Sequence, residues 1–442
     1  WLTGTERGQV VGIMAFDLSA AFDTVAAEQL LPKLQSLGVS GRALAWFKSY
    51  LTGGSQQVSW DGTLSDLIAV RYGVRQGSIL GPILFLVLIS DMANALGIGN
   101  DENVVYADDT TIWQTGKTVA EVVDKLTGKA AKFAEWSRGS GLTMNASKTQ
   151  LLLSSNAGSY QLGEQGTRIG DGLGRPGKGG GLPGKGGCRP SNGGGQPGKG
   201  ADRLGKGNTY VAVMVDGKEV KASDSIELLG VSFDRKLTTK PHAKAMLIAT
   251  KRRAAVISRL VNHIPRGAYL RQLATGLVNG KLCHALAAYA SPRLPTLVGE
   301  ATPPSTLFHQ IQVAYNRVAR SITGVRIRDR VTITDLLERA GLPSVNEMVI
   351  NAVATETWNC KHSSDGGNGA KNFVGAIIFD TGEAAKATRA TSAGMATIPL
   401  RGRDTFVSNG ARTWNASESL RAATTKAAAR LAAKNLSVRA PL

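Results

Sequence analysis

Two adjacent carboxylates, Asp108 and Asp109, interrupt the otherwise apolar and β-branched stretch "VVYADDTTIW" at residues 104–113. We expect strands at 103–107 and 110–114, with the two aspartates at the tip of the hairpin between them. Like charges repel, and Asp-Asp is not a pair that two-residue hairpin turns favour. A solvated turn is one interpretation of this pair. The other is a site for divalent cations, which convert the repulsion into attraction.

A second acidic cluster lies in "AFDLSAAFD" at residues 15–23. Asp17 closes the apolar run 10–18, which has the length and composition of a buried strand. If this strand lies beside the 103–114 hairpin, Asp17 comes close to Asp108. Mg²⁺ prefers oxygen ligands and keeps waters and substrate phosphates as its remaining ligands. Two such ions can activate an attacking hydroxyl and stabilise a leaving pyrophosphate, so the pattern suggests phosphoryl transfer.

The overall charge indicates a polyanionic partner. The 442 residues include 52 Lys and Arg against 33 Asp and Glu, which gives a formal net charge of +19. A nucleic acid or a membrane surface would match this charge. The longest apolar run, "ILFLVLI" at 83–89, is far shorter than the roughly 20 residues that a helix needs to span a bilayer. We therefore expect nucleic acid, and no membrane, as the partner.

Hydrophobic periodicity and turn residues predict the elements that must position these carboxylates. A further hairpin is expected at 55–73, with its turn at Asp61-Gly62. The segment 141–155 is expected to end in a strand. The helices predicted in this part of the chain are 26–38, 41–51, 77–96 and 118–138.

Further along, two strands are expected on either side of a turn at Asp216-Gly217, and a third strand through Leu228–Phe233. Helical periodicity follows at 235–271 and 305–358. The first of these segments carries ten Lys or Arg residues and no Asp or Glu, which indicates a basic amphipathic region. A solvated charged face is one interpretation, and contact with a nucleic-acid backbone is the other.

Residues 162–208 break this pattern. The motif PGKG recurs at Pro176, Pro183 and Pro197, in a stretch dominated by Gly, Pro and Lys. Gly and Pro at this density cannot bury a core, so we predict a disordered insertion. An inert spacer produced by repeat expansion is one interpretation. Non-specific phosphate contact by its basic residues is the other.

Five motifs resemble, in order and spacing, the palm motifs of non-LTR (LINE-type) retrotransposon reverse transcriptases. They are "AFDLSAAFDTV", "GVRQGSILGPILF", "YADD", "GLTMNASKTQLLL" and "LLGVSFD". The resemblance covers about 1–155 and 225–235, and "LLERAGLPSVNE" at 336–347 is similar to the tail of such proteins. It implies an α+β fold with a reverse-transcriptase palm, an antiparallel sheet backed by helices. A helical thumb and a mostly helical C-terminal region are expected to follow.

The resemblance also implies a division of the chain. Only 16 residues precede Asp17, so we expect the fingers part of the family, and an upstream endonuclease, to be absent from this chain. The expected parts are a palm at 1–161, the insertion at 162–208, the end of the palm with the primer grip at 209–236, a basic helical thumb at 237–300, and a C-terminal region of unknown role at 301–442.

By the same resemblance, Asp17 and Asp108 match the two metal-binding aspartates of the family. The backbone carbonyl of Leu18 is a further expected ligand, and Asp109 matches the third acidic residue. The implied cofactor is a pair of Mg²⁺ ions, with Mn²⁺ as a possible substitute.

Four further residues match positions around the incoming nucleotide. Phe22 matches the aromatic steric gate, whose ring excludes a ribose 2′-OH; the alternative is a core phenylalanine. Gln76 and Gly77 match the loop that lines the nucleotide pocket; the alternative is a helix-capping loop. Lys148 matches the lysine that protonates the leaving pyrophosphate; the alternative is a surface lysine.

The remaining matches concern the primer and the duplex. Leu228, Leu229, Gly230 and Val231 match the primer grip. The basic helical region then corresponds to the thumb, which holds the template–primer duplex through its backbone. The residues expected to make these backbone contacts are Lys244, Lys251, Arg252 and Arg253.

The function that the resemblance implies is RNA-directed DNA polymerisation with an RNA template, a DNA primer and dNTPs. One alternative is a catalytically dead, basic RNA-binding remnant of such an element, and another is an intron-encoded maturase. The resemblance implies an intracellular ribonucleoprotein, nuclear or cytoplasmic. The residues themselves do not indicate which RNA is copied.

Overall fold

The computed structural model describes residues 1, 4–5, 7–75, 77–99, 102–155, 211–294, 306–362, 395–396 and 405–438. The chain divides into two compact units, each with its own hydrophobic core. The first is Trp1–Gly230 with Asp234–Leu237, and the second is Val231–Phe233 with Thr238–Leu442. The predicted insertion at 162–208 lies outside the described residues. In the ranges given above, no helix has the length and apolarity to cross a membrane.

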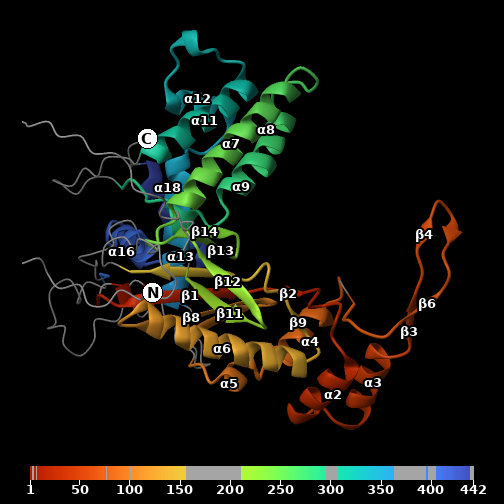
Figure 1. Cartoon of the computed structure of the whole chain (residues 1–442). Helices are drawn as coiled ribbons and strands as arrows, with labels where there is room; N and C mark the ends of the chain where they lie inside the picture. Colours follow the sequence, from red (N-terminus) through yellow and green to blue (C-terminus); the bar gives the residue numbers. More distant parts are fainter. Residues whose placement is uncertain are drawn as a thin grey trace, which may run out of the picture. The chain divides into compact units, whose positions relative to one another are not determined.

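The first unit is built on a six-stranded sheet in the order β11-β12-β10-β1-β8-β7, and helices pack with it into an α+β fold (Figure 1). The sheet is mixed, because β12 runs parallel to β10 while the other neighbours are antiparallel. A wholly antiparallel sheet was expected. The hairpin of β11 and β12 places its second strand against β10, so that this strand runs in the same direction as β10. The strands of the sheet are β1 (Val10–Phe16), β7 (Asn103–Tyr106), β8 (Asp109–Gly116), β10 (Gln150–Ser154), β11 (Ala212–Val215) and β12 (Lys218–Ser223).

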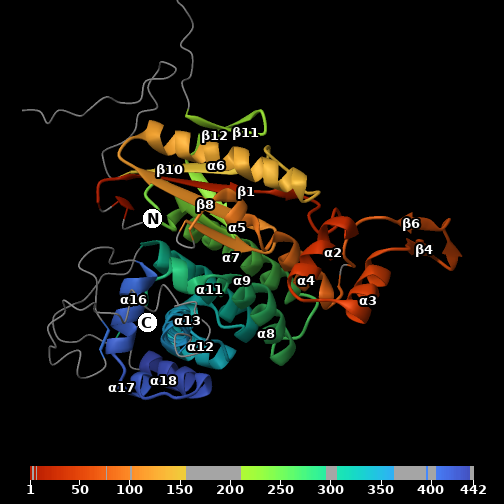
Figure 2. The ribbon, with the colours of Figure 1, turned by 90° about the horizontal axis from the view of Figure 1, so that it is seen from below.

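Strand β1 is central, with β8 on one side and β10 on the other. Its unbroken apolar sequence is the pattern of a strand covered on both faces. Helix α6 (Val119–Gly139) lies along the sheet (Figure 2). Gly12 permits this approach, because a Cβ there would lie 2.5 Å from a Val122 methyl and 2.7 Å from a Leu126 methyl. At the end of β1, Phe16 stacks on Phe133 of α6 with ring centroids 4.3 Å apart.

Helices α2 (Ala27–Ser36) and α3 (Gly41–Leu51) precede a long hairpin that extends away from the sheet (Figure 1). The predicted turn at Asp61-Gly62 is confirmed, with positive φ at both residues. Trp60 near the tip is 81% exposed. The paired strands of this hairpin are β3 (Gly54–Gln56) with β6 (Ile68–Val70), and β4 (Ser59–Trp60) with β5 (Thr63–Leu64).

The single helix predicted at 77–96 is wrong, because two helices occupy this segment: α4 (Leu80–Ile89) and α5 (Met92–Leu96). Asp91 lies at the break between them. Its carboxylate accepts hydrogen bonds from Lys33 Nζ at 2.7 Å and from Trp136 Nε1 at 3.0 Å. These tertiary contacts explain why an apolar run with helical spacing is interrupted at this point.

Two other turns differ from the sequence prediction. In the β7–β8 hairpin the turn residues are Ala107 and Asp108, while Asp109 already pairs with Tyr106 as the first residue of β8. The single strand predicted through 228–233 is wrong, because β13 (Ser225–Leu228) and β14 (Val231–Asp234) flank a two-residue turn with positive φ. Gly230 allows such a turn. The turn predicted at Asp216-Gly217 is confirmed between β11 and β12.

The second unit is helical. Helices α7 and α11 lie side by side in it (Figure 1). They run in the same direction, because Ser258 bonds Ser321 and Lys251 faces Ala314 at the same offset of 63 residues. Tyr315 of α11 is fully buried and donates a 2.8 Å hydrogen bond to Asn279. The described helices are α7 (Lys240–Leu260), α8 (Ala268–Ala274), the π-turn η1 (Thr275–Asn279), α9 (Gly280–Leu282), α10 (Leu286–Tyr289), α11 (Thr306–Thr323), the 3₁₀ turn η2 (Ile327–Asp329), α12 (Ile333–Ala340), α13 (Val345–His362), α16 (Phe406–Asn415), α17 (Glu418–Arg421) and α18 (Lys426–Val438).

Candidate active site

Three carboxylates gather at one end of the sheet in the first unit. The register pairs Phe16 of β1 with Thr110 of β8, so the next residues, Asp17 and Asp109, stand opposite each other across adjacent strands. Asp108 is in the turn just before Asp109. Like charges directly opposite each other on a sheet are destabilising. The two acidic clusters of the sequence therefore lie together, although repulsion between like charges on adjacent strands disfavours this arrangement.

The electrostatics of Asp109 reflect this crowding. Partial burial raises the pKa of its carboxyl, and the negative charges of Asp108 and Asp17 raise it further. The protein thus holds this carboxylate where its negative charge is disfavoured. A cation bound between the carboxylates would reverse this effect.

The side-chain oxygen Oδ2 of Asp17 is buried, and it has no hydrogen-bond partner among the residues that the structure describes. A buried acceptor left unpaired costs about 1–3 kcal/mol, and more when it is charged. Oxygen is the donor that Mg²⁺ prefers, and such an ion keeps part of its shell as waters and substrate phosphates. The residues present therefore fit a divalent cation.

Within the described ranges, no three His, Cys, Asp or Glu side chains converge closely enough to hold a metal ion by themselves. Leu18, whose carbonyl is an expected ligand, is buried at 7% exposure and pairs with Met144 through the short strands β2 (Leu18–Ser19) and β9 (Thr143–Met144). The backbone of the turn is strained as well, since Ala107 has a φ of 54°. Such backbone is uncommon for a residue with a side chain, and it occurs often at functional sites.

The turn that carries Lys148 is bonded to the backbone of Asp17. The Asn145 N–H donates to the Asp17 carbonyl at 2.8 Å, and the Asp17 N–H donates to the Thr149 hydroxyl at 3.5 Å. The same hydroxyl donates to the Asn145 carbonyl at 2.9 Å. Lys148 itself is exposed. The fold thus brings an exposed lysine onto a turn adjoining Asp17.

Phe22 is half-buried and stacks on Phe85 of α4, with ring centroids 4.5 Å apart. Its carbonyl accepts a 2.9 Å hydrogen bond from the Val74 N–H. Gly73 lies close to the backbone of Asp23, where a Cβ would approach the carbonyl oxygen to 3.1 Å. The segment after Asp17 is therefore bonded to the segment that leads into the Gly77 loop.

Gly77 adopts a φ of 79°, and the space where a side chain would start is open. Gln76 lies outside the described residues. In the residues that follow Gly77, the Ser78 hydroxyl accepts a 3.0 Å hydrogen bond from the Gly81 N–H at the start of α4. The loop therefore caps a helix. Its open glycine also leaves room for a ligand to approach the backbone.

The other predicted residues belong elsewhere. Leu228, Leu229, Gly230 and Val231 form the turn where the chain passes from the first unit to the second, and Leu229 is 48% exposed. In the second unit, the four predicted backbone contacts lie on α7: Lys244, Lys251, Arg252 and Arg253. The first three are exposed and Arg253 is half-buried.

Two residues of interest were not predicted from the sequence. Thr149, buried at 6% exposure, joins Asp17 to the Lys148 turn. A hydroxyl residue directly before an apolar strand was the feature of the sequence that could have indicated this role. Arg317 of α11 lines a cavity with Lys251 of α7. It lies in a stretch that helical periodicity alone could not place opposite the basic segment.

The chain belongs to the reverse transcriptase (RNA-dependent DNA polymerase) family, whose model matches residues 3–233. The match includes the first four motifs, the three carboxylates and all but the last residue of the fifth motif. The resemblance to non-LTR retrotransposon polymerases is confirmed by the relatives described next.

The chain is 31% identical over 161 residues to the RNA-directed DNA polymerase from mobile element jockey of Drosophila funebris, covering 35% of this chain and 18% of that protein. It is 33% identical over 137 residues to the jockey polymerase of Drosophila melanogaster, covering 30% and 15%. The Pol polyprotein from the type-1 retrotransposable element R2 of Popillia japonica is 24% identical over 155 residues, covering 32% and 24%. The chain thus spans less than a quarter of the length of these curated relatives.

Among solved structures, telomerase from Candida tropicalis, in complex with a fragment of telomeric RNA, is similar at a TM-score of 0.33 and 11% identity. The similarity covers 75% of this chain and 49% of that chain. This likeness is too distant to bear on function.

Proposed function

We propose that the chain carries the catalytic centre of an RNA-directed DNA polymerase of a non-LTR retrotransposon. The observation that carries this proposal is the buried, unpartnered Oδ2 of Asp17, beside Asp109 and Asp108. Asp17, Asp108, Asp109 and the Leu18 carbonyl would hold two Mg²⁺ ions, or Mn²⁺ in their place. When bound, such ions lower the pKa of an attacking hydroxyl and neutralise charge on a leaving pyrophosphate.

The other site residues would act on the nucleotide. Lys148 is on a turn bonded to Asp17 and is exposed, so that its ammonium can donate a proton to pyrophosphate. Phe22 would exclude a ribose 2′-OH. Gln76 and Gly77 would contact the nucleotide through a loop whose glycine leaves its surroundings open. The reaction joins a primer 3′-OH to the α-phosphate of a dNTP and releases pyrophosphate.

In this proposal the first unit is the palm, and the helices within residues 237–300 form the thumb. Residues 228–231 would be the primer grip, and the exposed cations of α7 would contact the backbone of the RNA–DNA duplex. An RNA template, a DNA primer and dNTPs are the proposed substrates. An intracellular ribonucleoprotein, nuclear or cytoplasmic, is the proposed setting.

The test is primer extension on an RNA template with Mg²⁺ and dNTPs. Asp17→Asn keeps the size of the side chain but removes its charge, so extension should fall by at least about a thousandfold. Asp124→Asn is the matched control, because Asp124 is exposed on α6 away from the carboxylates. It should extend primers as the wild type does. Duplex binding without Mg²⁺ should be unchanged in both variants.

Three outcomes would contradict the proposal. Equal extension by wild type and Asp17→Asn would show that the carboxylates are not the catalytic centre. No extension by the wild type, with tight duplex binding, would indicate a basic RNA-binding remnant. Splicing of an intron RNA by the wild type, without primer extension, would indicate a maturase.

A further inference from the structure

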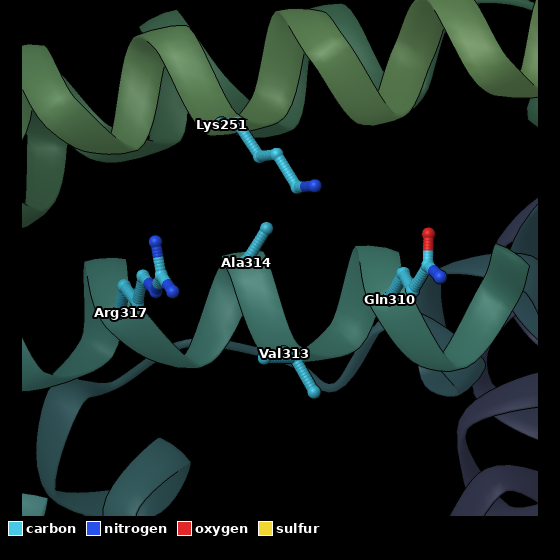
Figure 3. A pocket seen from close by; sticks show the side chains of 5 residues that line it. All are labelled: Lys251, Gln310, Val313, Ala314 and Arg317. Carbon is cyan, nitrogen blue, oxygen red and sulfur yellow. The ribbon is translucent and has the colours of Figure 1, made fainter.

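A cavity of about 160 Å³ lies between α7 and α11 of the second unit. Figure 3 shows Lys251 reaching from α7 toward the facing helix, and Arg317 and Gln310 on α11 to either side of Ala314. Ala314 is buried, while Lys251, Gln310 and Arg317 are exposed. The cavity thus has an apolar floor and a rim of polar and positive groups.

The positive charges of this rim are not balanced. No acidic residue lines the cavity. Across the described ranges, neither Lys251 nor Arg317 has a salt-bridge partner. Two cations that face each other across a groove without a carboxylate repel, and an anion between them would remove the repulsion. The groove is therefore suited to a negatively charged group.

The position of the two cations excludes a simpler explanation. Arg259 and Arg320 lie in the last turns of α7 and α11, where positive side chains stabilise the helix dipole. Lys251 lies in the middle of α7, and Arg317 lies before the last turn of α11. The dipole effect falls off within one turn of a helix end. Interaction with the helix dipole thus accounts for Arg259 and Arg320 but not for Lys251 and Arg317.

Geometry favours an extended polyanion over a single small anion. Lys244 and Lys251 are both exposed and seven residues apart, so they share one face of α7 about 10 Å apart along its axis. A sugar–phosphate backbone can follow such a line of charges. The guanidinium of Arg317 can donate two parallel hydrogen bonds to one phosphate.

We propose that this groove, formed by Lys251, Gln310, Ala314 and Arg317, holds one phosphate of a nucleic-acid backbone between α7 and α11. The inference deepens the proposed function, on which it rests for the identity of the ligand. It assigns a nucleic-acid contact to α11, in a part of the chain whose role the sequence left open. Arg317 and Lys251 act together on the same phosphate.

The test measures binding of a labelled RNA–DNA hybrid duplex to the full chain in EDTA, without dNTPs, as a function of salt. Lys251→Gln and Arg317→Gln should each weaken binding about tenfold. Because both side chains hold one phosphate, the double variant should lose little more than either single variant, far less than the hundredfold product. Each variant should also lower the slope of log affinity against log salt by about one.

Lys434→Gln is the charge-matched control, since Lys434 is exposed on α18 of the same unit. It should bind as the wild type does. Single variants that match this control, or a double variant equal to the product of the singles, would overturn the shared site. Binding of phosphatidylserine vesicles that depends on Lys251 and Arg317, with duplex binding unaffected, would also overturn it.

The assay separates this inference from the proposed function, because it involves no catalysis. Active primer extension with duplex binding insensitive to both positions would overturn the groove alone. Loss of extension with the coupled binding effect intact would overturn the catalytic proposal alone. A wild-type chain that binds no duplex would overturn both. Thermal unfolding of the Gln variants should occur at no lower temperature than in the wild type, since both side chains are exposed and each substitution removes a repulsive charge.

Discussion

The backbone N–H of Asn145 donates a 2.8 Å hydrogen bond to the carbonyl oxygen of Asp17, across the short β2–β9 pairing. The Thr149 hydroxyl completes this link, because it accepts from the Asp17 N–H and donates to the Asn145 carbonyl. A residue from each of two distant motifs is thereby held at the end of β1. This link fixes the turn on which Lys148 lies.

Removing the hydroxyl should therefore affect both stability and catalysis. Thr149→Val keeps the shape of a buried side chain but leaves the Asp17 N–H and the Asn145 carbonyl without this partner. We expect a loss of about 1–2 kcal/mol in the free energy of unfolding, and primer extension at least about tenfold slower. Thr149→Ser retains the hydroxyl and should preserve most of the activity. Equal extension rates for the Val and Ser variants would show that the link does not position the site.

Asp109 should make stability depend on pH and on metal. Its pKa is raised in the folded chain, so the unfolded chain loses this proton at lower pH. The folded state therefore loses stability as pH rises from the ordinary value, about 3.9, to the raised value. The loss persists at neutral pH.

Asp109→Asn should remove this loss. In EDTA at pH 7 the variant should unfold about 1 °C above the wild type, a small shift because water screens a partly exposed group. The difference should vanish below about pH 4. Added Mg²⁺ should stabilise the wild type more than the variant. Asp124→Asn serves as control, and a lower unfolding temperature for Asp109→Asn in EDTA would contradict the argument.

The contact between β1 and α6 should tolerate no side chain at residue 12. In Gly12→Ala the new methyl would meet Val122 and Leu126 at under 3 Å, and overpacking of this kind costs about 1–3 kcal/mol. Because β1 leads directly to Asp17, primer extension should fall as well. Thermal unfolding and primer extension measure the two effects.

Gly128→Ala is the matched control for that substitution. Gly128 lies within α6 with nothing near its missing Cβ, so alanine there should stabilise the helix by about 0.5–1 kcal/mol. The two Gly→Ala changes should therefore alter the free energy of unfolding in opposite directions. A change in the same direction for both would show that close packing does not exclude a side chain at Gly12.

Phe22 can be tested as a selectivity residue against its structural role. Phe22→Val shortens the ring that would exclude a ribose 2′-OH, and ribonucleotide incorporation relative to deoxynucleotide should rise at least about tenfold. Phe85→Val disrupts the same stacked pair from α4 and should destabilise the fold without changing sugar selectivity. If both variants change selectivity equally, Phe22 acts through packing alone.

Several features could be predicted from the sequence because they are local. Asp61-Gly62 and Asp216-Gly217 form turns where expected, since glycine accepts the positive φ that such turns require. The apolar run before Asp17 forms the central strand as its composition indicates. The pairing of Asp109 with Tyr106 was missed, because the sequence does not reveal which residues of a hairpin tip remain in register.

The sequence by itself predicted a metal-binding role for Asp17, Asp108 and Asp109, and it determined that the chain is strongly basic. Only the tertiary structure decided that Thr149 joins the Lys148 turn to Asp17, that β12 runs parallel to β10, and that Arg317 faces Lys251. The physical reason is the range of the interactions. A turn depends on the φ of one or two residues, whereas sheet order and helix pairing depend on burying surfaces contributed by residues far apart in the chain.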